Sequence, residues 1–167
     1  MNGLPQFLAQ NWALVTVFAA VALVYWLAQS SGSETEPPYV KRGSLATEIE
    51  LKFYKHLQAA VGGSWTIFSM VHLVEIIQAR PGTRNAQAWR NKTLDKRIDF
   101  VLCNHDSLEI LLAIALDDAS PESPEREQFI DSALASAGVP LLRVPVAEQY
   151  DKIVLRKQID DLLAGRK

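Results

Sequence analysis

The sequence is poor in several features that mark particular classes of protein. It has 167 residues but one cysteine, Cys103, which excludes an internal disulfide. Its formal net charge is only −2, which argues against a wholly basic nucleic-acid binder. Because 49% of the residues are hydrophobic and 22% are charged, the composition is that of a globular chain and not of a disordered one. The length allows one domain with an appendage.

Lysine and arginine are absent from the N-terminal part of the chain, and an apolar run from Trp12 to Ala28 lies there. These 17 residues would span about 26 Å as a helix, the short end of the about 30 Å that a hydrocarbon core requires. Aromatic residues stand at both ends, as is typical of membrane interfaces. We therefore predict a short tail, residues 1–11, and a transmembrane helix over residues 12–28. A buried core helix or a cleaved signal peptide is the alternative, although a signal peptide would need a basic start.

The first basic residues, Lys41 and Arg42, follow the apolar run. Since basic residues resist translocation, this order predicts a single-pass protein of the inner (cytoplasmic) membrane with its C-terminal domain in the cytoplasm. Residues 29–44, QSSGSETEPPYVKRGS, are polar and rich in Ser, Gly and Pro, which is typical of a flexible linker.

Residues 45–167 are long enough for one α/β domain, and their hydrophobic periodicity predicts the order α-β-β-β-α-β-α. The expected elements are a helix over Thr47–Val61 ended by two glycines, a strand over Trp65–Leu73, a hairpin of Ile98–Cys103 and Ile110–Leu116, a helix from Pro124 to Gly138, a strand over Val139–Val144 and a C-terminal helix stopped by Gly165.

Charge is unevenly distributed in this domain. Six basic residues and one acidic residue lie between Arg80 and Arg97, whereas nine acidic residues and one arginine lie between Asp99 and Asp131. A basic loop beside carboxylates at strand ends suits a phosphodiester ligand, although a solvated loop is the alternative. The candidate nucleic-acid-binding residues are Arg84, Arg90, Lys92, Lys96, Arg97 and Arg143.

Three segments, KRIDFVLCN (96–104), LLAIALDDAS (111–120) and AGVPLLRVP (137–145), resemble a bacterial domain family of unknown function. That family belongs to the PD-(D/E)XK, restriction-endonuclease-like superfamily, near the very-short-patch repair endonucleases. The resemblance extends from about Leu45 to Leu163. It implies a restriction-endonuclease-like mixed sheet flanked by helices, and a nuclease centre that uses Mg²⁺.

The resemblance also implies site residues. The helix glutamate of the family matches Glu50, and the aspartate of its first site strand matches Asp99. The third strand of the family ends in Glu-x-Asp-Asp with a later histidine, but Ala115 and Pro121 stand where that glutamate and that histidine belong. Only Asp117 and Asp118 remain of this cluster.

Asp99 and Asp117 could still supply two metal ligands, since Mg²⁺ typically takes one or two carboxylates. Each acidic residue also has a structural interpretation. Glu50 has capping-box spacing from Thr47, and Asp117 could form a turn or cap. Asp99 lies in an apolar run and needs a partner, either a metal ion or a base such as Arg143.

The two missing site residues favour a degenerate nuclease-like centre that binds nucleic acid, DNA or RNA, or a protein partner, without cutting. The first alternative is an active Mg²⁺-dependent DNA endonuclease that uses Glu50, Asp99 and Asp117. The second is a protein-interaction module without affinity for nucleic acid, since the domain is nearly neutral overall.

Overall fold

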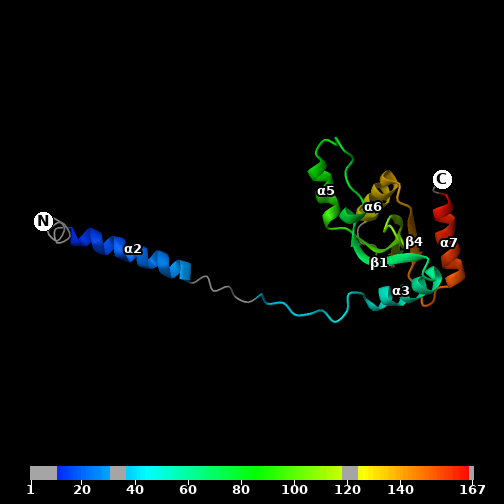
Figure 1. Ribbon diagram of the computed structural model, residues 1–167, viewed down its shortest axis with the longest axis horizontal. Helices are drawn as coiled ribbons and strands as arrows, with labels where there is room; N and C mark the ends of the chain where they lie inside the picture. Colours follow the sequence, from blue (N-terminus) through cyan, green and yellow to red (C-terminus); the bar gives the residue numbers. More distant parts are fainter. Residues whose placement is uncertain (1–10, 31–36, 118–123, 166–167) are drawn as a thin grey trace. The chain divides into compact units, whose positions relative to one another are not determined.

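A computed structural model of the chain describes residues 11–30, 37–117 and 124–165. The chain forms two compact units, Met1–Gly43 and Ser44–Lys167. The first unit contains the helix α2, Trp12–Ser30, and the second contains a mixed α/β domain (Figure 1).

The helix α2 corrects the prediction of a membrane span. It has 19 residues, and its side chains from Trp12 to Leu27 are exposed. Within the described residues, no helix combines the length and the apolar character needed to cross a membrane. The apolar run reaches only about 26 Å, less than a hydrocarbon core of about 30 Å, and the residues that extend the helix, Gln29 and Ser30, are polar. The predicted transmembrane helix over residues 12–28 and the single-pass inner-membrane localisation are therefore wrong.

The second unit is built on a four-stranded sheet, counted over the described residues. Its strands are β1 (Trp65–His72), β2 (Arg97–Asn104), β3 (Ile110–Asp117) and β4 (Leu141–Pro145), in the spatial order β1-β2-β3-β4. The pairs β1/β2 and β2/β3 are antiparallel, whereas β3 and β4 are parallel. A parallel pair needs a crossover connection, and the helix α6, Pro124–Ala137, forms part of it. The mixed sheet flanked by helices agrees with the prediction.

Alternating side chains divide the core between the two faces of the sheet. The helices α3 (Glu48–Val61) and α7 (Lys152–Ala164) pack with one face, where Phe53, Phe100 and Leu112 are buried. The helix α6 and the short helix α4 (Leu73–Ile76) pack with the other, where Leu134 and Ala113 are buried. The two faces therefore have separate hydrophobic clusters, and the candidate site lies on the α6 side.

The helix ends follow the predicted capping residues. Gly62, with φ of 57°, ends α3, and Gly138, with φ of 72°, ends α6. At the second end, Val139 N–H donates to Leu134 C=O at 3.0 Å, so Val139 belongs to the helix end and β4 starts later than predicted. Pro124 is the first residue of α6, as predicted. Ser123, a residue type that favours the N-cap position before such a proline, lies outside the described residues.

The chain between β1 and β2 contains two helices that the sequence did not predict, α4 and, within the basic segment, α5 (Ala86–Leu94). The helix α5 buries only Thr93, and its large apolar residues, Trp89 and Leu94, are exposed. Hydrophobic periodicity predicts helices through an apolar stripe, and α5 has none to detect. The predicted basic loop therefore contains a helix of nine residues, α5.

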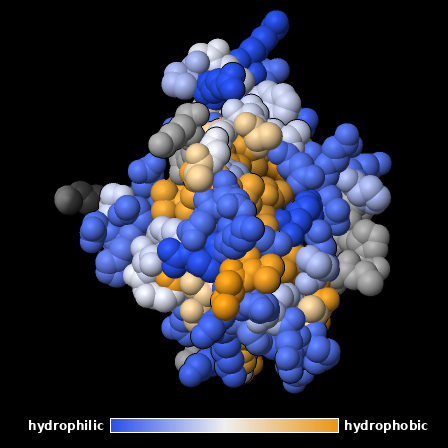
Figure 2. Space-filling model, turned by 90° about the vertical axis from the view of Figure 1, so that its right-hand side faces the viewer, coloured by the Kyte–Doolittle hydropathy of each residue, from blue (hydrophilic) through white to orange (hydrophobic). Residues whose placement is uncertain are grey.

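Hydrophobic residues also reach the surface in patches on the side of the molecule where α7 lies (Figure 2). On α7 itself, Ile153 and Val154 are 72% and 54% exposed. Most of this face is hydrophilic, and scattered apolar exposure of this kind is normal for a globular domain.

Candidate functional site

The sheet is interrupted on both sides of Asp99. In β1, the residue opposite Asp99 is Met70, which is left out of the register and has a left-handed backbone, with φ of 58°. In β3, the pairing with β2 ends at Phe100 and Ile114, one residue before Asp99 would face Ala115. Left-handed backbone at a residue other than glycine is uncommon and tends to occur at functional sites.

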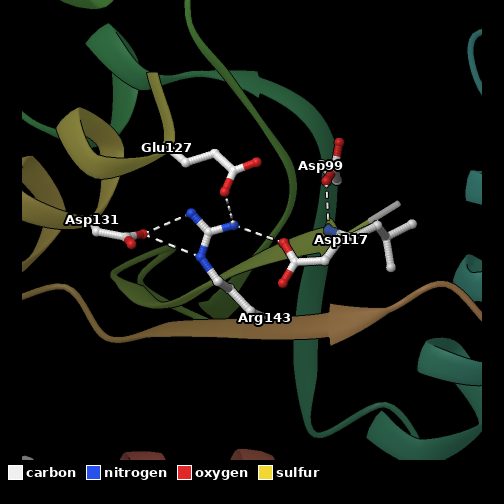
Figure 3. A network of polar contacts seen from close by, with 6 residues as sticks. Asp99, Asp117, Glu127, Asp131 and Arg143 are labelled. Carbon is white, nitrogen blue, oxygen red and sulfur yellow. Dashed lines mark hydrogen bonds and ion pairs between the residues drawn. The ribbon is translucent and has the colours of Figure 1, made fainter. Parts of the chain in front are cut away.

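The Asp99 side chain takes over a backbone hydrogen bond at this interruption. Its Oδ2 accepts from the Leu116 backbone N–H at 2.7 Å (Figure 3). Asp99 is half-buried, so this bond satisfies a donor that would otherwise lack a ladder partner. The Asp99 carboxylate, which lies in an apolar run and needs a polar partner, thus finds one in the backbone of β3.

Asp117 and Arg143 lie on the face of the sheet that α6 covers. In the parallel pair, Ala115 is opposite Arg143, and Asp117 lies two residues further along β3. Strand alternation directs Asp117 and Arg143 toward α6, which contributes Glu127 and Asp131 four residues apart. Figure 3 shows the Arg143 side chain pointing between the carboxylates of β3 and α6.

Arg143 connects these carboxylates through its guanidinium. Its Nη1 donates to Asp117 Oδ1 at 2.7 Å and lies 3.8 Å from Glu127 Oε2. Its Nη2 donates to Asp131 Oδ1 at 2.8 Å. Partial burial alone would lower the pKa of Arg143, but the hydrogen bonds and charges of Asp131 and Asp117 outweigh it and raise the pKa above its usual value. The guanidinium is therefore a fixed positive charge among three carboxylates.

This donor set does not fit the Mg²⁺ centre that the resemblance implies. Ala115 offers no carboxylate, one Asp117 oxygen is held by Arg143 and one Asp99 oxygen by Leu116. Over residues 11–30, 37–117 and 124–165, no three His, Cys, Asp or Glu side chains are grouped so that they could hold a metal ion. Asp118 and Pro121, also named from the sequence, lie outside the described residues. The role of Asp99 and Asp117 as Mg²⁺ ligands stays a prediction.

Glu50 completes the capping box that its spacing from Thr47 predicts. Its carboxylate accepts from Thr47 N–H at 2.6 Å, and Thr47 Oγ1 accepts from Glu50 N–H at 3.2 Å. The helix α3 that bears Glu50 packs with the sheet face opposite to the one toward which Asp117 is directed. The structure thus brings Asp99 to Leu116, the residue before Asp117, and gives Glu50 a structural contact elsewhere.

The predicted phosphate-binding residues fall into two groups. Arg143 is held in the carboxylate network, and Lys96 forms an ion pair with Asp95 at 2.9 Å. The remaining cations belong to the segment around α5 and are exposed; they are Arg84, Arg90, Lys92 and Arg97. Lys92 lies over the ring of Trp89, with its Nζ 4.5 Å from the ring centroid. The exposed cations of the basic segment are thus the ones that a phosphate could reach.

Sequence reasoning missed Glu127, Asp131, Met70 and Trp89. The four-residue spacing of Glu127 and Asp131 on a predicted helix was a usable signal, because it places both on one helix face. The left-handed backbone of Met70 had no sequence signal, since glycine and asparagine are the residues that usually mark that conformation.

The chain therefore contains a mixed α/β domain with a carboxylate-arginine network on the α6 side of its sheet, beside the parallel strands β3 and β4. The chain belongs to a protein family of unknown function, DUF2726, which matches residues 42–162. The predicted resemblance to a family of unknown function is confirmed to this extent, and the relationship to the PD-(D/E)XK nucleases stays a prediction. No curated protein and no solved structure matches the chain.

Proposed function

We propose that residues 44–167 form a nucleic-acid-binding module, derived from a PD-(D/E)XK nuclease, whose catalytic centre is degenerate. The observation that carries this proposal is the Arg143 guanidinium, hydrogen-bonded to Asp117 at 2.7 Å and to Asp131 at 2.8 Å. The positively charged guanidinium of Arg143 thus bonds to Asp117, the carboxylate that the nuclease resemblance assigns to a metal ion.

Among the residues that the structure describes, the centre has too few free donor oxygens for a metal-dependent nuclease. Cleavage of a phosphodiester by a divalent cation requires carboxylates that are free to bind the cation and to leave positions for substrate oxygens. Here Asp117 is ion-paired, Asp99 bonds to the backbone of β3, and Ala115 replaces a carboxylate. Such a centre does not favour turnover, so the proposal assigns this domain a binding role.

The binding surface in this proposal is the segment around α5. Four exposed cations, Arg84, Arg90, Lys92 and Arg97, lie close together in the sequence, and none has an ion-pair partner within the described part of the chain. Cations of this kind neutralise phosphates and release counterions, which makes the affinity dependent on salt.

Fluorescence anisotropy of labelled single-stranded and duplex DNA, titrated with the full chain over a range of NaCl concentrations, tests the binding. We expect a variant with glutamine at these four positions to bind more weakly and to show a shallower salt dependence, by about 0.7 to 0.9 in logarithmic slope for each lost phosphate contact. The matched control changes four exposed lysines elsewhere, Lys41, Lys55, Lys152 and Lys157, to glutamine and should behave as the parent chain does. Absence of binding at low salt, or an unchanged slope in the first variant, would contradict the proposal.

Incubation of the full chain with supercoiled plasmid and Mg²⁺ or Mn²⁺ tests the degenerate centre. We expect no nicking above that of a protein-free control. Metal-dependent nicking that Asp99→Ala abolishes would instead establish an active endonuclease.

A further inference from the structure

A groove of about 900 Å³ lies between α5, α6 and the chain that connects α4 to α5. Its apolar lining includes Trp89 of α5, Phe129 of α6 and Ile77. The volume is in the range of about 300–1,000 Å³ that small-molecule sites occupy, so the groove has room for a nucleotide and is too small for a folded partner. It is separate from the carboxylate-arginine network, none of whose residues lines it.

Trp89 is the feature of this groove that packing does not explain. Its side chain is 48% exposed, although tryptophan is usually among the more buried residues. The helix α5 buries only Thr93, and close to half of the Trp89 surface remains open to a ligand. Lys92 Nζ lies 4.5 Å from the ring centroid, which orients the indole by a cation–π contact while leaving it exposed at the groove.

The charge of the lining is complementary to a phosphate. Arg80, Arg90 and Lys92 line the groove, and among its described residues Glu75 is the one acid. Arg80 donates to the Ser136 carbonyl at 3.0 Å, which ties the connecting chain to α6 and positions a guanidinium at the rim. An exposed indole beside cations is the combination that binds an unpaired nucleotide, through stacking of the base and neutralisation of the phosphate.

We propose that this groove binds unpaired nucleotides of single-stranded nucleic acid, with Trp89 as the stacking platform and Arg90 and Lys92 as phosphate contacts. The inference rests on the proposed nucleic-acid binding and specifies the form of nucleic acid that is bound. Single strands are favoured over duplex because the bases of a duplex are stacked on one another, so a ring inside a groove can accept only a base that has left the stack.

Anisotropy measurements with labelled oligothymidylate and with a duplex of equal length, at one low salt concentration, test the inference on the full chain. We expect the single strand to bind more tightly than the duplex. Trp89→Ala should weaken single-strand binding about tenfold or more and leave duplex binding unchanged, because only the stacked base contacts the ring. Trp89→Phe, which keeps a ring, should retain most of the affinity.

Two controls accompany these variants. Asn91→Ala, at an exposed position of α5 that does not line the groove, should bind as the parent chain does, and circular dichroism should show that Trp89→Ala is folded. Binding should also quench tryptophan emission in the parent chain more strongly than in Trp89→Phe, in which the other three tryptophans remain.

The outcomes separate this inference from the proposed function. If duplex and single strand bind equally well, or if Trp89→Ala binds the single strand unchanged, the groove inference is wrong while the nucleic-acid-binding function stands. If neither form of DNA binds, both are wrong, and a peptide segment of a protein partner becomes the occupant to pursue.

Discussion

Arg143 determines the electrostatic balance of the α6 side of the sheet. Its side chain is 27% exposed, and the side chains of Asp117, Glu127 and Asp131 are 41%, 43% and 51% exposed. Single exposed ion pairs contribute little to stability, but one guanidinium shared by three acids also prevents the repulsion that these acids would otherwise exert on one another.

We therefore expect Arg143→Met to lower the free energy of unfolding by about 1–2 kcal/mol, between the values for exposed and for buried pairs. Methionine keeps much of the apolar stem and removes the charge. Because the remaining repulsion is electrostatic, the loss should shrink when NaCl is added. Urea unfolding at low and high salt measures both effects, with Arg143→Lys as the charge-preserving control. An unchanged midpoint at low salt would show that the network is electrostatically neutral in its effect on folding.

Asp99 is expected to stabilise the sheet through its bond to the Leu116 N–H. Asp99→Ala removes the acceptor and leaves a half-buried donor unsatisfied, which costs about 1–3 kcal/mol. Asp99→Asn keeps a carbonyl oxygen and should lose less. Urea unfolding of both variants tests this order, and an equal loss in both would mean that the negative charge of Asp99, and not its acceptor, stabilises the fold.

For single residues, the sequence predicted that the Asp99 carboxylate needs a bonding partner, but it did not identify that partner. A carboxylate in the run IDFVLC had to be satisfied, and we considered a metal ion or Arg143. The structure shows a bond to a backbone N–H, which depends on the end of the β2–β3 pairing. Where strand pairing stops is a tertiary property, so no local pattern could reveal it.

The start of α3 gives a prediction for a whole element. Thr47→Ala removes one half of the capping box and should lower the free energy of unfolding by about 1 kcal/mol. Glu50→Gln should have little effect on stability, because glutamine also serves at this position of a capping box. Thermal or urea unfolding of the two variants measures the difference. A much larger loss in Glu50→Gln than in Thr47→Ala would show that the charge of Glu50 has a further partner.

Among the elements, those with a buried stripe were predictable and those without one were not. The helix α3 buries Phe53, Leu57, Ala60 and Val61, whose spacing marks it clearly in the sequence. The helix α5 buries Thr93 alone, so its position follows from its connection to α4 and not from its own pattern. Trp89, which the periodicity analysis missed, lies on this helix, lines the groove and is 48% exposed.

For the whole molecule, the division into two units determines where the hydrophobic core lies. Every residue of the two hydrophobic clusters lies in the second unit, between Phe53 and Leu163. The sequence placed a boundary near residue 44 from the polar composition of residues 29–44. The apolar composition of residues 12–28 suggested a membrane span that the structure does not support. Apolar composition alone does not establish that a helix is long enough to cross a bilayer.

Removal of residues 1–43 should therefore leave the second unit folded. A fragment of residues 44–167 keeps both hydrophobic clusters and the capping box of α3, so we expect the same urea midpoint and m value as for the α/β transition of the full chain. A fragment of residues 65–167 is the matched control. It lacks Phe53, Leu57, Ala60 and Val61, all at most 7% exposed, and should lose cooperative unfolding because the face of the sheet beneath α3 is uncovered. If the longer fragment also unfolded without cooperativity, the first unit would have to supply contacts on which the α/β fold depends.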